Sequence, residues 1–115
     1  MYSIGSIERS GDVIVQHVRR ADTFVARLVG LMPRSSLALE EGLLLPRTNQ
    51  VHCFGMRFPI DIAFLHENGR VLSVQPALRP WRVSRFEPEA SAVLELAVTA
   101  LETLHIEPGQ VLHFR

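Results

Sequence analysis

The segment IDIAFLHENGRVLSVQ, residues 60–75, constrains the fold of this chain more than any other stretch. Two runs of alternating apolar residues flank the pair Asn68-Gly69. Both of these residues accept the positive φ that a type I′ turn requires, so the segment predicts a tight β-hairpin. The expected register pairs Glu67 with Arg70 across the turn and places Asp61 on an apolar face.

The rest of the chain predicts mostly short strands. Apolar residues alternate or run together in five further segments, and we expect strands there: residues 13–18, 42–46, 51–58, 92–98 and 110–114. A turn at Glu107-Pro108-Gly109 precedes the last of them.

Two short helices are expected, near residues 22–32 and 99–105. Asp22 is placed to cap the first, and Pro33 stops its apolar repeat. Thr99 and Glu102 have the spacing of a capping box, which opens the second helix. Because strands and helices do not alternate regularly, the pattern predicts a mainly β domain, an antiparallel sandwich or barrel.

Composition limits the size and the partners of the molecule. The chain has 115 residues, of which 47% are hydrophobic, which suits a single domain over residues 1–115. Twelve arginines balance twelve acidic residues, and the pI is near 7.0. The chain therefore lacks the overall charge typical of binding to nucleic acids or anionic membranes, and we expect neither partner. Composition does not predict the oligomeric state.

Location is inferred from the absence of targeting patterns. No apolar run reaches the length of a membrane span, and MYSIGSIERSGD at the start has neither a basic region nor a long apolar region. We therefore expect a soluble, cytoplasmic protein. The single cysteine, Cys53, excludes an internal disulfide framework and agrees with a reducing compartment.

Several segments match a pattern that recurs in one known family. They are ADTFVARLVGL, EGLLL, VHCFGMRFPIDIAFL, ENGRVL, PALRPWRV, AVLEL and IEPGQVL, which lie between about residue 20 and residue 114. The most recognisable element, H-x-x-x-M-x-x-x-x-D, is formed by His52, Met56 and Asp61. The chain thus resembles the bacterial and archaeal domain of unknown function family 192. The resemblance implies a mainly β, jelly-roll-like domain without an established activity. Many relatives look exported, and they commonly have Thr where this chain has Cys53.

His52 is the first candidate for a functional side chain. In an extended segment 51–58, His52, Phe54 and Met56 would share one apolar face. A buried histidine there needs a hydrogen-bond partner, which a backbone carbonyl or Asp61 could supply. The alternative is a binding or acid-base histidine, since imidazole titrates near neutral pH and a carboxylate could orient it.

Asp61 is the second candidate. A lone carboxylate on an apolar face costs several kcal/mol unless it is paired or protonated, so we expect a cationic partner. Arg57, Arg79, Arg82 and His52 are the candidates for that partner. A structural ion pair and a carboxylate held ready for a ligand both remain open.

A third candidate is the segment RPWRVSRF, residues 79–86. In an extended chain Arg79, Trp81 and Arg85 share one face, while Arg82 points to the other. Such a stripe suits an anion or a stacked ring. The alternative is solvated arginines beside a tryptophan that covers the core.

His52, Cys53 and Met56 also carry the ligand types that suit a soft metal. Cys53 would point away from the other two, and the sequence offers no second cluster to complete a site. We therefore expect no metal and no other cofactor. Cys53 should be an inert buried thiol, because no neighbouring cation is placed to lower its pKa.

Two classes of function stay open at this point. The first is a small-ligand-binding domain with a pocket formed from these residues: His52, Met56, Arg57, Asp61, Arg79, Trp81 and Arg82. The second is a hydrolase-like acid-base enzyme that uses His52 and Asp61, although the sequence contains no nucleophile motif such as G-x-S-x-G. A structural or interaction domain without a pocket is a third alternative. The missing motifs favour binding, and no catalytic residue is assigned.

Overall fold

The computed structural model describes residues 2–115 and, at Phe24, the backbone alone. Seven strands and two short helices make up the described chain. Their bounds are β1 Tyr2–Arg9, β2 Asp12–Ala21, α1 Phe24–Val29, β3 Glu41–Pro46, β4 Ile60–Leu65, β5 Val71–Leu78, β6 Ala92–Ala97, α2 Ala100–Thr103 and β7 His113–Phe114.

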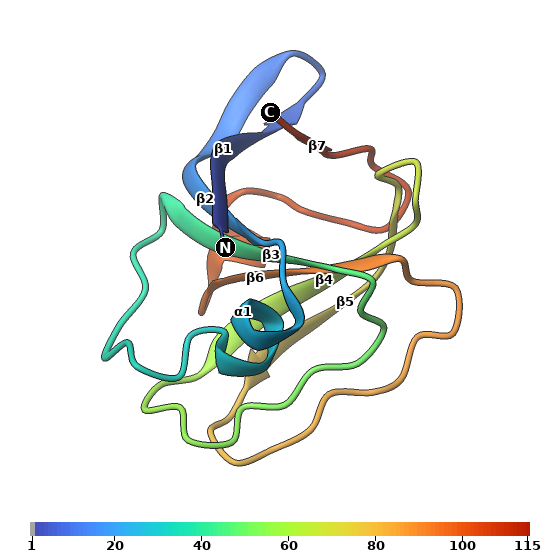
Figure 1. Ribbon diagram of the computed structural model, residues 1–115. Helices are drawn as coiled ribbons and strands as arrows, with labels where there is room; N and C mark the ends of the chain where they lie inside the picture. The colour runs from blue at the N-terminus through green and yellow to red at the C-terminus, as the bar shows by residue number, and fades with distance from the viewer. Residues whose placement is uncertain (1) are drawn as a thin grey trace.

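The seven strands form one curled sheet in the order β5-β4-β6-β3-β2-β1-β7. Figure 1 shows this sheet as a half-barrel with α1 in front of it. The expectation of a mainly β domain with two short helices is confirmed. The expectation of a purely antiparallel sheet is wrong, because β2 and β3 are parallel neighbours joined through α1. All seven strands belong to one sheet, so a jelly-roll or sandwich arrangement is not shown.

The predicted central hairpin is confirmed, with a longer loop than expected. His66 N donates to Arg70 O at 2.9 Å, so Glu67 does not pair with Arg70. Gly69 has a φ of 89°, whereas Asn68 is not among the residues with positive φ. Asn68 instead accepts a hydrogen bond from Arg70 N through its side-chain oxygen at 2.9 Å. This Asx-type turn replaces the type I′ turn.

The N-terminal hairpin was not predicted. The expected first strand, residues 13–18, is the middle of β2, and β1 precedes it. The two strands join at Ser10 and Gly11, which have φ values of 54° and 86°. Two successive residues with positive φ are what a type I′ turn needs. A Ser-Gly pair is a weaker indication of this turn than Asn-Gly, because Ser adopts positive φ less readily.

The expected strand at residues 51–58 is wrong. Only His52 forms a ladder contact, a single bridge to Val83, and the chain then turns at Phe54 and Gly55. Gly55 has a φ of 78°, which breaks the extended conformation. The faces assigned to this segment from strand alternation therefore do not apply.

The expected extended stripe at residues 79–85 is also wrong. Arg82 N donates to Arg79 O at 3.3 Å and closes a turn in which Trp81 has a φ of 66°. Arg79, Trp81 and Arg85 thus do not line one strand face. Pro80 excludes a helical start for this segment, and a turn satisfies that restriction as well as a strand does.

Both helices are shorter than expected and are capped differently. Thr23, rather than Asp22, caps α1, since its Oγ1 accepts from Ala26 N at 3.1 Å. Asp22 instead accepts hydrogen bonds from Ser3 and Arg20. At α2, Thr99 has a φ of 76° and makes no side-chain capping bond, so the expected capping box is absent.

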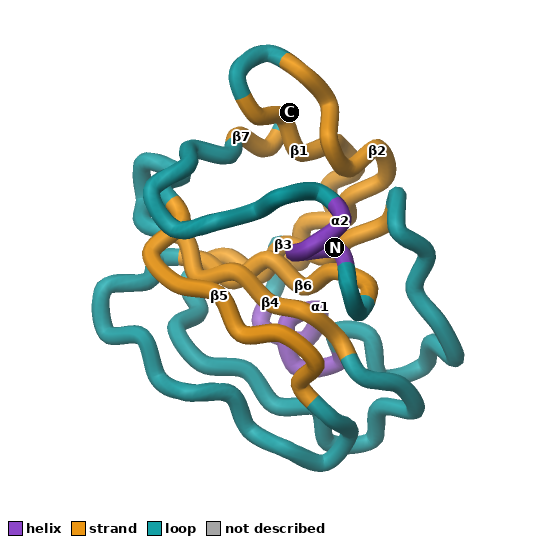
Figure 2. The backbone as a smooth tube through the Cα atoms, turned by 180° about the vertical axis from the view of Figure 1, so that it is seen from behind, coloured by secondary structure: helices purple, strands orange, loops and turns teal. Residues whose placement is uncertain are grey.

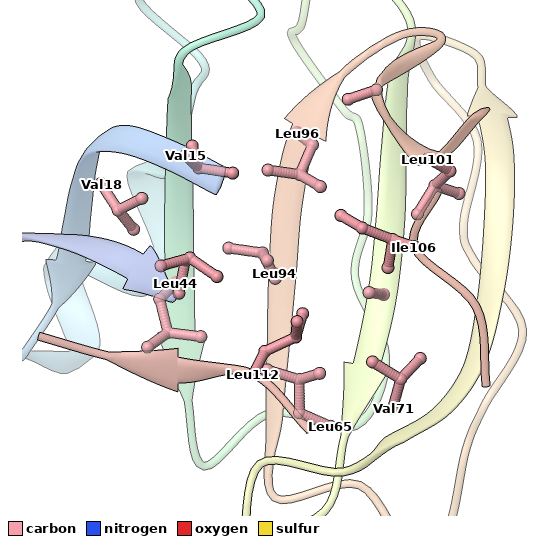
Figure 3. Packing of buried hydrophobic residues seen from close by; sticks show 13 residues of the cluster. Val15, Val18, Leu44, Leu65, Val71, Leu94, Leu96, Leu101, Ile106 and Leu112 are labelled. Atoms are coloured by element: carbon pink, nitrogen blue, oxygen red, sulfur yellow. The ribbon is translucent and has the colours of Figure 1, made fainter. Parts of the chain in front are cut away.

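The sheet is buried on both faces. Figure 2 shows α2 on the face opposite α1. The α2 core, shown in Figure 3, contains these residues: Ile7, Val15, Val18, Leu44, Ala63, Leu65, Val71, Leu94, Leu96, Ala100, Leu101, Ile106 and Leu112. The α1 core contains these: Ala21, Ala26, Leu31, Leu43, Leu45, Val51, Cys53, Met56, Ile60, Ile62, Phe64, Leu78 and Val93.

Candidate functional site

Glu95 is a carboxyl group in the middle of the sheet. It lies on β6 between Leu43 of β3 and Ile62 of β4, and only 3% of it is exposed. Side chains alternate along a strand, so Glu95 shares a face with Val93 and belongs to the α1 side of the sheet. The fold therefore buries a titratable group where alternation alone would place an apolar one.

A cavity of about 270 Å³ reaches Glu95 from the α1 side, and we call it the Glu95 cavity. Eleven residues form its walls: Arg27, Leu28, Gly30, Leu31, Leu45, Arg47, Thr48, Gln50, Val51, His52 and Glu95. They come from α1 and the turn after it, from β3 and the segment that follows it, and from β6. The walls thus combine an apolar surface with two guanidinium groups, one imidazole and one carboxyl group.

Glu95 has no hydrogen-bond partner at Oε1 within residues 2–115. Burial raises its pKa from the ordinary value of 4.5 to about 8. At neutral pH the carboxyl group is therefore mostly protonated, with an O–H that can donate and a carbonyl that can accept. Buried polar groups are nearly always bonded, so an unpartnered carboxyl oxygen on a residue that lines a cavity marks a candidate binding site.

Cys53 lies in the α1 core and interacts electrostatically with Glu95. Burial, and secondarily the charge of Glu95, raises the pKa of this thiol to about 12. The expectation that nothing lowers the pKa of Cys53 is confirmed. At neutral pH the residue is a neutral thiol.

Hydrogen bonds between two loops hold the wall of the cavity near His52. Val51 O accepts from Ser84 N at 2.8 Å, and Val51 N donates to Ser84 Oγ at 3.0 Å. Cys53 N donates to Arg82 O, and Trp81 N donates to Cys53 O, both at 2.8 Å. These bonds fix the backbone on both sides of His52, which is half-buried.

Three rings extend outward from this wall. His52 stacks on Phe54 with ring centroids 4.9 Å apart, and Phe54 stacks on Trp81 at 6.2 Å. His52 Nδ1 also accepts from Phe54 N at 3.2 Å. Phe54 and Trp81 are exposed. The expected proximity of Trp81 to His52 is thus present, through Phe54 rather than through a shared strand face.

Asp61 is buried, but the expected cationic partner is wrong. Its Oδ1 accepts from Ala77 N at 2.9 Å and its Oδ2 accepts from Leu101 N at 3.0 Å. Backbone N–H groups satisfy a buried carboxylate as well as a cation does, and Leu101 offers one of the free donors of a helix start. Asp61 thereby takes the role expected of Thr99, which is to cap α2.

Asp61 and His52 are not brought together. Asp61 lines another cavity, of about 500 Å³, on the α2 side of the sheet. His52 lines the Glu95 cavity on the α1 side. Both oxygens of Asp61 already hold backbone amides, so the structure provides no Asp61 contact that would orient the imidazole.

The other predicted site residues are placed in three ways. Met56 is buried in the α1 core. Arg57, Arg79 and Arg82 are exposed, and the last two belong to the turn that carries Trp81. Of the residues predicted as a ligand site, His52 alone is among those that line the Glu95 cavity.

Sequence reasoning missed Glu95, Arg27 and Arg47. A detectable indication of Glu95 was present, because it is the single charge within the apolar run AVLELAV. A strand that is buried on both faces has a nearly continuous apolar sequence. A charged residue within such a strand is costly to bury unless it has a partner or is neutralised, so it marks a candidate functional group. No comparable indication marks the two arginines, since the chain has ten others.

Across residues 2–115, His, Cys, Asp and Glu side chains do not gather in groups of three able to hold a metal ion. In the same part of the chain, none of the helices is long and apolar enough to cross a membrane.

Comparison with known proteins decides the family. The model of the DUF192 family, described as "Uncharacterized ACR", matches residues 6–114. The chain belongs to this family. A UPF0127 protein of Thermococcus gammatolerans is 34% identical over 109 residues, which cover 91% of this chain and 71% of that one. A UPF0127 protein of Pyrococcus furiosus is 34% identical over 107 residues, which cover 90% and 91%. The resemblance noted from the sequence is thereby confirmed.

Two crystal structures share the fold of this DUF192 chain. One is a Sinorhizobium meliloti protein provisionally named a transcription regulator, with a TM-score of 0.85 and 22% identity over 98% of this chain and 95% of that one. The other is a Novosphingobium aromaticivorans protein of unknown function, with a TM-score of 0.83 and 23% identity over 97% and 84%. At these identities the likeness concerns the fold alone.

Proposed function

We propose that this protein is a small-ligand-binding domain and that its ligand occupies the Glu95 cavity. The observation that carries the proposal is the buried Oε1 of Glu95, which has no hydrogen-bond partner within residues 2–115. Leaving a buried polar group unsatisfied costs about 1–3 kcal/mol. A ligand that bonds to Glu95 would offset this cost, whereas a purely structural role for the carboxyl group leaves it unexplained.

The location of the cavity supports the same proposal. Small-molecule sites are concave and mainly apolar, with a few polar groups that fix orientation. The Glu95 cavity has this character, since Leu28, Leu45 and Val51 supply apolar wall and His52 and Glu95 supply polar groups. His52, which lines the cavity, stacks on the exposed ring of Phe54, and Phe54 stacks on the exposed ring of Trp81. The pocket that we predicted near His52 and Trp81 is thus retained in the proposal, with Glu95 in place of Asp61.

The acid-base alternative has less support. It needs His52 and Asp61 in contact, and these residues line separate cavities. A domain without any pocket is equally hard to reconcile with the Glu95 cavity. We therefore propose binding rather than catalysis.

A fragment screen by NMR tests the proposal. Protein labelled at Leu and Val methyl groups is titrated with a library of small molecules of six to twelve non-hydrogen atoms. We expect binders to shift the methyl signals of Leu31, Leu45 and Val51, and to leave those of Val74 and Leu101 in the Asp61 cavity unchanged. Glu95→Leu, which fills the polar end of the cavity with an apolar group, should abolish these shifts. Shifts confined to the Asp61 cavity, or no shifts at all, would reject the proposal.

A further inference from the structure

The charges around the Glu95 cavity are unequal in sign. Its walls contain two guanidinium groups, from Arg27 and Arg47, and one carboxyl group, from Glu95. Arg27 is half-buried on α1, and Arg47 is exposed at the end of β3. The Arg47 guanidinium donates a long hydrogen bond from Nη2 to Asp22 O at 3.4 Å. With Glu95 protonated, the walls carry a net positive charge.

We propose that the ligand of this cavity is a small organic anion, with a carboxylate that faces the guanidinium groups and Glu95 and an apolar body against the leucine walls. This inference rests on the function proposed above. Guanidinium groups bind carboxylates through paired N–H donors, and a protonated carboxyl group donates a short, strong O–H bond to a carboxylate. A neutral ligand would satisfy Glu95 but would gain nothing from the two arginines.

The size of the cavity limits the ligand. One water molecule takes about 30 Å³ of liquid volume, so a cavity of about 270 Å³ holds roughly nine groups of that size. Benzoate has nine non-hydrogen atoms, a carboxylate and a flat apolar ring. Benzamide has the same shape and size without the charge. The two compounds form a matched pair of probes.

Binding of an anion should depend on the protonation of Glu95. The charged and titratable groups that line the cavity with Glu95 are Arg27 from α1 and Arg47 and His52 from the segment after β3. Cys53 interacts with Glu95 electrostatically. The strand neighbours of Glu95 on β3 and β4 are Leu43 and Ile62. Above about pH 8 the proton of Glu95 is lost, and the new carboxylate repels the ligand. Cys53 stays neutral in this range because its pKa is raised to about 12.

Calorimetric titration with benzoate and benzamide at pH 6.5 and pH 9.5 tests the inference. We expect benzoate to bind at least ten-fold more tightly than benzamide at pH 6.5, and to lose ten-fold or more of its affinity at pH 9.5. Glu95→Gln keeps a neutral donor, so it should bind benzoate at both pH values with little difference. Arg47→Gln should weaken benzoate ten-fold or more and leave benzamide unaffected. Arg57→Gln, an exposed arginine outside the cavity, is the matched control and should change neither.

The outcomes separate the two proposals. Equal or tighter binding of benzamide would overturn the anion inference while supporting a ligand site. No binding of either probe, in a protein whose cavity methyl groups respond to neutral fragments, would likewise overturn the anion inference alone. No response of those methyl groups to any fragment would overturn the proposed function itself.

Discussion

Glu95 couples the stability of the protein to pH. Its pKa is raised by burial from 4.5 to about 8 in the folded state, so between these pH values the unfolded state binds fewer protons than the folded state. The free energy of unfolding therefore falls as the pH rises from 4.5 to 8, by up to about 5 kcal/mol from this group. In the Glu95→Gln variant, which has no group that titrates at this position, the free energy of unfolding should not show this fall with pH. Denaturant melts of both proteins between pH 5 and pH 8.5 provide the comparison, and parallel curves would contradict the expected shift.

Asp61 is expected to matter for stability rather than for ligand binding. Its two oxygens accept from Ala77 N and Leu101 N, and hydrogen bonds to a charged group contribute about 1.5–3 kcal/mol each. Asp61→Ala should therefore lower the free energy of unfolding by about 3–5 kcal/mol. Asp12→Ala, at an exposed position, should stay within about 0.5 kcal/mol of the parent. Chemical denaturation measures both, and a loss below 1 kcal/mol at Asp61 would refute this role.

The central hairpin, formed by β4 and β5, depends on the glycine in its loop. Gly69 has a φ of 89°, and a Cβ there would lie 2.2 Å from Leu112 O. Gly11 has a similar φ of 86°, but a Cβ there would meet nothing within 4 Å. In both Gly→Ala variants the free energy of unfolding should fall by about 1–2 kcal/mol, because alanine adopts a positive φ less readily than glycine. Gly69→Ala should cost at least about 2 kcal/mol more, because the backbone of the C-terminal segment must shift. Equal melting temperatures for the two variants would contradict this contact.

The elements also show how far local sequence predicts this fold. β4 and β5 were predicted because alternation and a turn signature coincide within sixteen residues. The strand at residues 51–58 failed because Gly55 turns the chain there, and apolar composition alone does not reveal a positive φ. The capping box at Thr99 failed because Asp61, forty residues earlier, supplies the acceptor for Leu101 N. Local patterns thus predict elements well until a distant residue competes for the same hydrogen bond.

The candidate site could not be assembled from the sequence, because its residues come together only in the folded molecule. Arg27, Arg47, His52 and Glu95 come from segments that only the folded sheet brings to one cavity. The sequence prediction placed Asp61 with His52 because both residues belong to the apolar segment 51–65. Successive side chains of a strand point to opposite faces of the sheet. The sheet therefore separates the α1 side, where His52 lies, from the α2 side, where Asp61 lies. Glu95 was detectable only as an unexplained charge in an apolar strand.

Because Cys53 is buried in the α1 core, we expect its thiol to react slowly with thiol reagents. The thiol is inaccessible and its pKa is raised to about 12, so the thiolate fraction at pH 7.5 is negligible. Labelling by a thiol reagent should require opening of the core, and its rate should increase steeply with denaturant. A surface cysteine introduced as Ser35→Cys is the control and should react at once. Rapid labelling of the native parent would contradict the packing around Cys53.

A direct titration of Glu95 shows whether its carboxyl group is buried and protonated at neutral pH, as the proposed binding of an anion requires. In protein labelled with ¹³C at the glutamate carboxyl carbon, the Glu95 signal is assigned by its loss in Glu95→Gln and followed from pH 4 to pH 10. We predict a carboxyl signal that stays in its protonated position at pH 7 and titrates with a midpoint of about 8. A midpoint near the ordinary value of 4.5 would show that Glu95 is hydrated or paired in solution, and would rule out a protonated Glu95 as the donor to an anionic ligand.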